Sequence, residues 1–227
     1  YAEVFVGMGG VFFRRRAAPP AEVINDRSGD VANLFRILQR HYPQFMDTLR
    51  FQLSGRREFE RLKASDPTTL TDLERAGRFL YLQKLAFGGK VAGQNFGVDP
   101  SSAAGFNLTR LEPLLADIHE RLAGVTIECL DWSDFIDRYD RPETLFYLDP
   151  PYWGSEGVYG KELFARDQFA LMAEHGAVCN HCPSANMKLA VGGESAQAFP
   201  YAMARQAGAR VALGTDGPCS NNSLDML

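Results

Sequence analysis

The chain has 227 residues, 45% of them hydrophobic and 23% charged, and a formal net charge of −4. These proportions are typical of a globular α/β domain with an insertion. No apolar run reaches about 18 residues and the first residues lack a basic segment, so the sequence predicts neither a transmembrane helix nor a signal peptide. The four cysteines include one C-x-x-C pair without the partners of a zinc site, and we expect reduced thiols in a cytoplasmic protein.

The first forty residues alternate between predicted strands and helices. Residues 1–6 have the composition of a strand and lead into a turn with three glycines, after which residues 11–13 begin a short helix. Residues 22–26 form a second predicted strand, and residues 29–42 have apolar side chains at helical spacing. This β-α-β-α order predicts a parallel sheet with crossover helices. Because residues 1–6 already have strand character, we also expect further residues upstream.

Residues 43–109 interrupt this order and predict a mainly helical insertion. Helical patterns at 45–53, 58–63 and 71–87 are followed by a glycine- and serine-rich stretch at 88–105. The α/β order then returns, with strands predicted at 125–129 and 143–148 and helices at 111–122, 134–136 and 168–174. We therefore expect an α/β domain made of residues 1–42 and 110–174, interrupted by the insertion at 43–109.

The last part of the chain, residues 175–227, predicts a separate β-α-β tail. Residues 176–181 and 210–213 have strand character, and residues 196–206 between them have a helical pattern. The sequence thus predicts three parts in all.

The glycine turn and an aspartate at the end of the second strand predict a nucleoside site. Ligands of an open α/β sheet bind beyond the carboxyl ends of its strands. Gly7, Gly9 and Gly10 let the backbone approach a ligand closely because they carry no Cβ. Asp26 ends the second strand, where a carboxylate can accept hydrogen bonds from ribose hydroxyls. A helix cap is the alternative for Asp26, and these two features alone leave both interpretations open.

Asp149, Pro150, Pro151 and Tyr152 directly follow an apolar strand and carry the strongest chemical signal. The prolines cannot donate ladder hydrogen bonds, so the strand ends there. Asp149 and the Pro150 carbonyl can each accept an N–H of an exocyclic amino group, which aims the nitrogen lone pair at a methyl donor. Tyr152 can stack on a flipped base. The alternative is a turn with a capping aspartate, which the glycine turn and Asp26 make much less favourable.

The insertion is locally basic in an acidic protein. Nine basic residues and five acidic residues lie between Arg50 and Lys90. Such a segment predicts contacts with phosphates, and the candidates are Arg56, Arg57, Lys84 and Lys90. A solvated helix face of mixed charge is the open alternative.

Three motifs in this order resemble the Dam-like, D12 class of DNA adenine-N6 methyltransferases. They are Glu3-Val4-Phe5-Val6-Gly7-Met8-Gly9-Gly10, Ile24-Asn25-Asp26-Arg27-Ser28-Gly29-Asp30 and Phe146-Tyr147-Leu148-Asp149-Pro150-Pro151-Tyr152. Phe79-Leu80-Tyr81-Leu82 and Phe87-Gly88-Gly89 also resemble the family's helical target-recognition region. The resemblance covers residues 1–173. It implies a Rossmann-like S-adenosylmethionine-dependent methyltransferase sheet that methylates adenine N6 in double-stranded DNA.

The resemblance also assigns roles to residues. It implies that Glu3, Gly7 and Gly9 lie along the methionine part of S-adenosylmethionine with Phe5 beside them, and that Asp26 holds the ribose. Asp131 would lie beside the adenine of the cofactor, although a helix N-cap is an equal alternative. The catalytic residues implied are Asp149, Pro150, Pro151 and Tyr152. We expect a monomer without a metal, because the cationic sulfonium already activates the methyl group.

The sequence differs from the pattern of this family in two ways that bear on whether the protein is active. The lysine- and glycine-containing cofactor motif that normally precedes the first strand is not in the sequence, and the family's last strands are not recognisable after residue 173. A fold that binds the cofactor but is inactive is therefore an alternative.

The tail resembles a different family, the metal-dependent amidohydrolases of the nucleoside deaminase branch. Two segments carry the resemblance: one runs from His181 to Ala190, and the other is Leu213-Gly214-Thr215-Asp216-Gly217 with Ser220-Asn221-Asn222. Asp216 would match a metal-binding aspartate, yet the sequence has no H-x-H pair to complete such a site. We therefore expect a chimeric chain joined near residues 173–175. The alternatives are a deaminase fragment and a methyltransferase tail with accidental likeness.

Overall fold

The computed structural model of the chain describes residues 1–86, 94–97, 105–149, 173–174, 176, 178–181 and 201–213. Contacts divide the chain into two compact units, Tyr1–Asp149 and Pro150–Leu227. Each unit has a sheet of its own. The predicted boundaries at residues 42/43, 109/110 and 174/175 stay predictions, since most residues around the last of them lie outside the described part.

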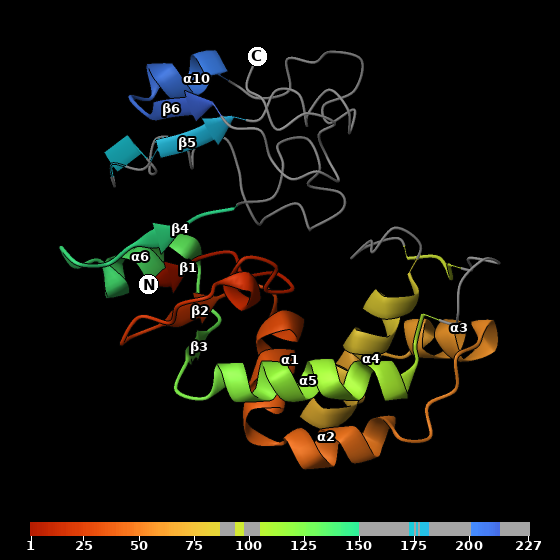
Figure 1. Cartoon of the computed structure of the whole chain (residues 1–227). Coiled ribbons are helices and arrows are strands. Elements are labelled where there is room, and N and C mark those ends of the chain that lie inside the picture. Colours follow the sequence, from red (N-terminus) through yellow and green to blue (C-terminus); the bar gives the residue numbers. More distant parts are fainter. Residues whose placement is uncertain are drawn as a thin grey trace. The chain divides into compact units, whose positions relative to one another are not determined.

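The first unit contains a four-stranded parallel sheet, in which the strands follow the order β3-β2-β1-β4 (Figure 1). The strands are β1 (Ala2–Glu3), β2 (Val23–Asn25), β3 (Thr126–Glu128) and β4 (Phe146–Tyr147). Glu3 of β1 is in register with Ile24 on one side and Tyr147 on the other. All four strands lie within segments predicted from the sequence, and the parallel sheet with its helices confirms the predicted α/β fold.

The strand order contains one reversal. The chain passes from β1 to β2 to β3 toward one edge of the sheet and then returns to place β4 on the opposite side of β1. The carboxyl ends of β1 and β4 therefore flank the topological switch point, where open α/β sheets bind their ligands.

Eight helical segments accompany the sheet in the described part of this unit. They are η1 (Phe12–Arg14), α1 (Gly29–Arg40), α2 (Tyr42–Leu49), α3 (Arg56–Ala64), η2 (Pro67–Thr69), α4 (Asp72–Leu85), α5 (Leu108–Leu122) and α6 (Trp132–Tyr139). Helix α4 begins at a capping box, in which Thr71 and Glu74 satisfy each other's backbone N–H groups.

One predicted helix ends earlier than its apolar pattern indicates. The pattern at 45–53 predicts a helix through Leu53, but α2 ends at Leu49. The Leu53 carbonyl accepts a hydrogen bond of 2.7 Å from the Tyr81 hydroxyl, and the Gln52 N–H donates to the Leu49 carbonyl at 3.0 Å. A tertiary contact from α4 thus holds residues 50–55 as a loop.

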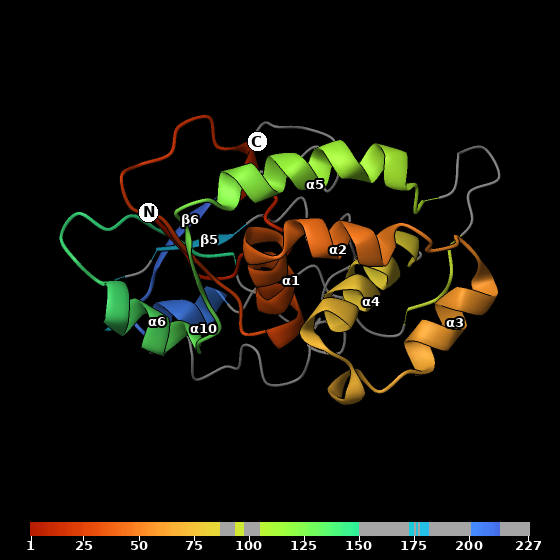
Figure 2. The ribbon, with the colours of Figure 1, turned by 90° about the horizontal axis from the view of Figure 1, so that it is seen from below.

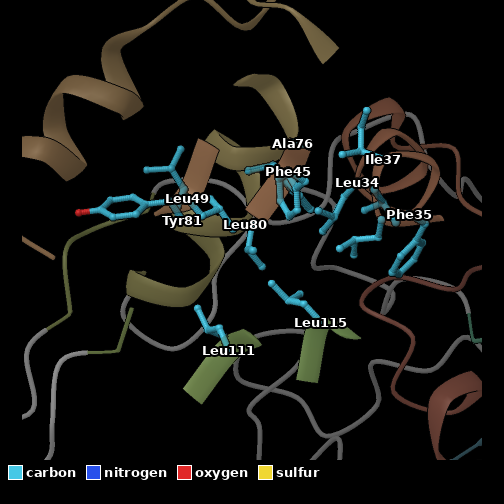
Figure 3. Packing of buried hydrophobic residues seen from close by; sticks show 14 of the residues in the cluster. Leu34, Phe35, Ile37, Phe45, Leu49, Ala76, Leu80, Tyr81, Leu111 and Leu115 are labelled. Carbon is cyan, nitrogen blue, oxygen red and sulfur yellow. The ribbon is translucent and has the colours of Figure 1, made fainter. Parts of the chain in front are cut away.

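A single hydrophobic core joins the sheet to the helices of the insertion. It includes Ile24 of β2, Leu34 of α1, Phe45 of α2 and Tyr81 of α4, all nearly or fully buried. Figure 2 shows α1, α2, α4 and α5 gathered together, and in Figure 3 Leu111 and Leu115 of α5 lie opposite Leu80 of α4. The insertion is therefore fixed to the α/β part by packing rather than tethered as a loop.

The second unit contains the predicted β-α-β tail. Strand β5 (Val178–His181) pairs in parallel with β6 (Arg210–Leu213), and α10 (Tyr201–Gln206) precedes β6 in the sequence. Both tail strands lie where the sequence predicts them. Among the described residues of both units, no helix is long and apolar enough to cross a membrane.

Candidate cofactor-binding and catalytic site

The predicted site residues of the first unit gather at one edge of the sheet. Because β1 to β4 are parallel, their carboxyl ends share that edge. The glycine turn follows β1, and Asp26 follows β2. Asp131 comes three residues after β3, and Asp149 comes two residues after β4. Four segments far apart in sequence thus present a turn and three carboxylates in one place.

The glycine turn has backbone conformations that require glycine. Gly7 and Gly9 have φ angles of 51° and 74°, in the left-handed region that side chains disfavour. The Gly9 N–H donates to the Val6 carbonyl at 2.8 Å, and the Phe13 N–H donates to the Gly9 carbonyl at 2.9 Å. A Cβ on Gly9 would lie 2.2 Å from the Phe13 ring, whereas one on Gly7 would meet no atom within 4 Å. The turn therefore presents open backbone beside Gly7.

Asp26 accepts two backbone hydrogen bonds, one of which comes from the glycine turn. The Gly7 N–H donates to Oδ2 at 2.9 Å and the Ser28 N–H donates to Oδ1 at 2.8 Å. Burial raises the pKa of the Asp26 carboxyl above its usual 3.8, and the hydrogen bonds from Ser28 and Gly7 work in the opposite direction. Each carboxylate oxygen can accept a further hydrogen bond. Asp26 can therefore hold the turn and a pair of ribose hydroxyls at the same time.

Glu3, the last residue of β1, adds a fourth carboxylate at this edge and is 2% exposed. The Tyr1 hydroxyl donates to its Oε2 at 2.7 Å. Burial raises the pKa of Glu3 above its usual 4.5, and the nearby charge of Asp149 raises it further. Hydrogen bonds from Tyr1 and the Phe12 backbone and the charge of Arg15 act in the opposite direction. The carboxylates of Glu3 and Asp149 thus lie close enough for their charges to interact across β1 and β4.

Asp131 is the N-cap of α6. Its Oδ1 accepts hydrogen bonds from the Ser133 N–H at 3.2 Å and the Ser133 hydroxyl at 3.0 Å. Its Oδ2 pairs with the Arg27 guanidinium at 3.2 Å. The capping role predicted as one alternative is confirmed, and contact with the cofactor's adenine stays a prediction. Because Arg27 directly follows Asp26, this ion pair joins the segment after β3 to the segment after β2.

Asn25 is a structural residue of this edge that the sequence interpretation missed. It is 1% exposed, and its amide donates to the carbonyls of Val4 at 3.0 Å and Leu130 at 3.1 Å. Its Oδ1 accepts the Leu130 N–H at 2.8 Å. One side chain therefore connects the ends of β1, β2 and the segment that leads to Asp131. The sequence feature that could have indicated this role is a polar residue that follows two apolar residues of a strand and immediately precedes Asp26.

A second network lies where β1 and β2 begin. The Arg121 guanidinium makes two hydrogen bonds to Glu22, of 2.6 and 2.7 Å, and Arg15 pairs with the same carboxylate at 2.9 Å. Arg15 also lies 3.5 Å from the centroid of the Tyr1 ring, whose hydroxyl holds Glu3. This network therefore connects α5 to Tyr1 and, through the Tyr1 hydroxyl, to Glu3, and the sequence interpretation missed it.

The remaining predicted residues are only partly described. Phe5 is half-buried between two buried valines, and Asp149 is exposed at the carboxyl end of the sheet. The Val4 N–H donates to the Tyr147 carbonyl at 3.0 Å, which fixes the chain two residues before Asp149. Pro150, Pro151 and Tyr152 lie outside the described residues, so their catalytic roles stay predictions.

The predicted DNA contacts lie on two helices of the insertion. Arg56 and Arg57 open α3, and Lys84 lies in the last turn of α4; all three are exposed. The Arg56 guanidinium lies 5.1 Å from the centroid of the Phe96 ring. Lys90 lies outside the described residues.

Within the described part of the chain, no group of three or more His, Cys, Asp and Glu side chains is arranged to hold a metal ion. Asp216 of the tail lies outside that part.

Residues 1–205 match the family of D12 class N6 adenine-specific DNA methyltransferases. The chain belongs to this family. The match begins at β1 and includes the glycine turn, Asp26, the helical insertion and the segment that contains Asp149. The family predicted from the three sequence motifs is thereby confirmed.

Partial matches to 5-methylthioadenosine/S-adenosylhomocysteine deaminases accompany this D12 class match. The protein of Thermococcus onnurineus is 33% identical over 117 residues, which are 50% of this chain and 26% of that protein. The protein of Halobacterium salinarum is 52% identical over 59 residues, which are 26% of this chain and 12% of that protein. The chain spans about a quarter or less of the length of these two relatives. The two resemblances expected from the sequence are thus both found, as expected for a chimeric chain.

Proposed function

We propose that this D12 class protein transfers a methyl group from S-adenosylmethionine to the N6 amino group of an adenine flipped out of double-stranded DNA. One observation carries the proposal: the Gly7 turn is bonded to Asp26 on one side of the switch point, and Asp149 stands at the other. Methyl transfer requires the cofactor beside Asp26 and the target amino group beside Asp149 to lie in the same crevice.

The residues present fit the proposed cofactor. Asp26 keeps free lone pairs for two ribose hydroxyls after it has accepted the Gly7 and Ser28 N–H groups. The open backbone at Gly7 leaves room for the methionine part. Glu3 is a candidate partner for the methionine ammonium group, because a cation there would favour the charged form of the buried carboxyl group.

Asp149 carries the chemical step in this proposal. Its carboxylate accepts one N–H of the target amino group and so directs the nitrogen lone pair away from the adenine ring. When bound, S-adenosylmethionine supplies a methyl carbon on a cationic sulfur; the N–C bond forms as the C–S bond breaks. Once the N–C bond has formed, the Asp149 carboxylate accepts the proton that the methylated nitrogen loses. Pro150 and Tyr152 are proposed to accept the second N–H and to stack on the base.

The insertion is the proposed DNA-binding part. Arg56, Arg57, Lys84 and Lys90 would bind phosphates and position the duplex, while base contacts set the target sequence. We expect the protein to act as a monomer in the cytoplasm, where DNA and S-adenosylmethionine are both present. Incubation with duplex DNA and S-adenosylmethionine, followed by nucleoside mass spectrometry, tests the function: N6-methyl-2′-deoxyadenosine supports it, and unmodified DNA contradicts it.

Hydrolytic deamination of an adenine nucleoside is the second candidate, and the partial matches to 5-methylthioadenosine/S-adenosylhomocysteine deaminases favour it. Such a reaction replaces the amino group with oxygen from water and releases ammonia. The sequence lacks an H-x-H pair to act with Asp216 on a metal. Ammonia release from 5-methylthioadenosine that a chelator abolishes would promote this candidate over methyl transfer.

A further inference from the structure

Two large apolar side chains are strongly exposed in the loop between α2 and α3. Phe51 is 86% exposed and Leu53 is 77% exposed. Burying side chains of this kind is favourable, so a neighbouring exposed pair of them marks a contact surface more often than a single exposed residue does. We call Phe51 and Leu53 the apolar patch, and residues 50–55 the patch loop.

Hydrogen bonds from residues outside the patch loop hold its backbone in place. The Tyr81 side chain is fully buried, and its hydroxyl donates to the Leu53 carbonyl at 2.7 Å and accepts the Gly55 N–H at 3.2 Å. Figure 3 shows Tyr81 at the edge of the core with its oxygen directed away from the other side chains. The Ser54 hydroxyl also donates to the Phe106 carbonyl at 2.5 Å. The backbone is thus held in place while the apolar side chains face solvent, which lowers the entropy cost of binding through them.

The charges around the patch select an anionic partner. Three arginines and no acidic residue lie between positions 50 and 57. The Arg50 guanidinium lies 5.9 Å from the centroid of the Phe51 ring, and Arg56 and Arg57 are exposed at the start of α3. The next acidic residue, Glu58, is already paired with Arg61 through hydrogen bonds of 2.9 and 2.6 Å. Within the described part of the chain, no ion pair engages the three arginines.

We propose that the patch loop extends the DNA contact of the insertion: Phe51 and Leu53 enter a groove or a base step of the duplex, and Arg50 binds the adjoining phosphates together with Arg56 and Arg57. Apolar side chains flanked by basic residues are the usual means of such contacts. The inference rests on the proposed methyltransferase function. Figures 1 and 2 both show the segment between α2 and α3 at the end of the insertion away from α6, so the contact is with DNA that flanks the target adenine.

The test measures the dissociation constants of Phe51→Ala, Leu53→Ala and the double variant for a series of duplexes of increasing length. Because the side chains are exposed, the variants fold as the wild type does, and thermal melting verifies this. For long duplexes we expect the Phe51→Ala constant to rise about tenfold, the scale of one lost aromatic contact with a base. For duplexes too short to reach the loop we expect no change. The salt dependence of binding should stay the same, since no phosphate contact is removed.

Two further variants sharpen the test. Leu114→Ala, at a 54% exposed leucine of α5, is the matched control and should bind every duplex as the wild type does. Tyr81→Phe removes only the hydroxyl that positions the patch loop, and it should weaken binding of long duplexes while S-adenosylmethionine binding is unchanged. A Tyr81→Phe variant that loses affinity for short and long duplexes equally would contradict a role through the loop.

Three outcomes would overturn the proposal. If the wild type methylates DNA and the patch variants bind all duplexes equally well, the surface proposal fails and the proposed function stands. If sedimentation shows a wild-type dimer that Phe51→Ala converts to a monomer, the patch is an interface between copies of this chain. If the wild type binds no duplex of any length, the proposed function fails together with the patch.

Discussion

The backbone N–H of Gly7 donates a hydrogen bond of 2.9 Å to Oδ2 of Asp26, nineteen positions further along the chain. This bond joins the turn after β1 to the end of β2 and sets the spacing between the two elements that the cofactor proposal uses. It also engages one oxygen of the carboxylate without exhausting its capacity to accept hydrogen bonds. The relationship makes Asp26 both a support of the turn and a candidate ligand of ribose.

Removal of the Asp26 carboxylate should weaken cofactor binding. We expect Asp26→Ala to lower the affinity for S-adenosylmethionine by roughly 1.5–3 kcal/mol, the scale of hydrogen bonds to a charged group. Isothermal titration calorimetry measures the effect. Asp134→Ala, at an exposed carboxylate of α6, is the control and should bind as the wild type does. Equal affinities for all three proteins would remove Asp26 from the site.

The two glycines at positions 9 and 10 should differ sharply in tolerance. Gly9→Ala places a Cβ at φ 74° and 2.2 Å from the Phe13 ring, so we expect a loss of about 1–3 kcal/mol in the free energy of unfolding and weaker cofactor binding. Gly10→Ala meets no atom within 4 Å and should change stability by less than about 0.5 kcal/mol. Chemical denaturation of both variants checks the difference. A Gly9→Ala protein as stable as Gly10→Ala would show that the turn has another conformation.

Glu3 should make the protein less stable as the pH rises. Its pKa is raised in the folded state above the usual 4.5, so between 4.5 and the raised value the folded protein binds more protons than the unfolded chain. The free energy of unfolding therefore falls with rising pH in this window, by about 1.4 kcal/mol for each pKa unit of the shift. Urea denaturation at several pH values should show a flatter dependence for Glu3→Gln than for the wild type. Glu120→Gln, at an exposed residue of α5, should leave the wild-type dependence unchanged.

The basic residues of the insertion should contribute to the salt dependence of DNA binding. Each variant that loses a phosphate contact should lower the slope of log K against log salt by about one unit. The variants to compare are Arg56→Ala, Arg57→Ala, Lys84→Ala and Lys90→Ala. Arg138→Ala on α6, whose arginine pairs with Glu128 at 3.8 Å, should keep the wild-type slope. Fluorescence anisotropy with a labelled duplex provides the slopes. Wild-type slopes for all the insertion variants would indicate a solvated mixed-charge face instead.

The strands and the edge that carries the site were predictable because their signals are local. Apolar runs that end in Gly7, Asp26 and Asp149 define β1, β2 and β4 and place their ends at one edge of a parallel sheet. Helix positions followed from apolar spacing in the same way, as α1 illustrates with buried Val31 and Leu34.

The supporting contacts were not predictable because they join distant segments. Glu22 and Arg121 are ninety-nine positions apart, and Asn25 bonds to Leu130 across one hundred and five positions. Nothing in the local sequence distinguishes these polar residues from others at strand ends. The end of α2 at Leu49 likewise depends on the Tyr81 hydroxyl of another helix. The apolar pattern through Leu53 therefore predicted a helix where the protein has an exposed loop.

The central claim is that Asp149 acts on the N6 amino group of a flipped adenine, and single-turnover methylation tests it most directly. Wild type and Asp149→Ala are each mixed with labelled S-adenosylmethionine and duplex DNA, and the label at adenine N6 is followed over time. We expect transfer by the wild type, and no measurable transfer by Asp149→Ala although its affinity for S-adenosylmethionine is nearly unchanged. Transfer at the wild-type rate by Asp149→Ala would contradict the account.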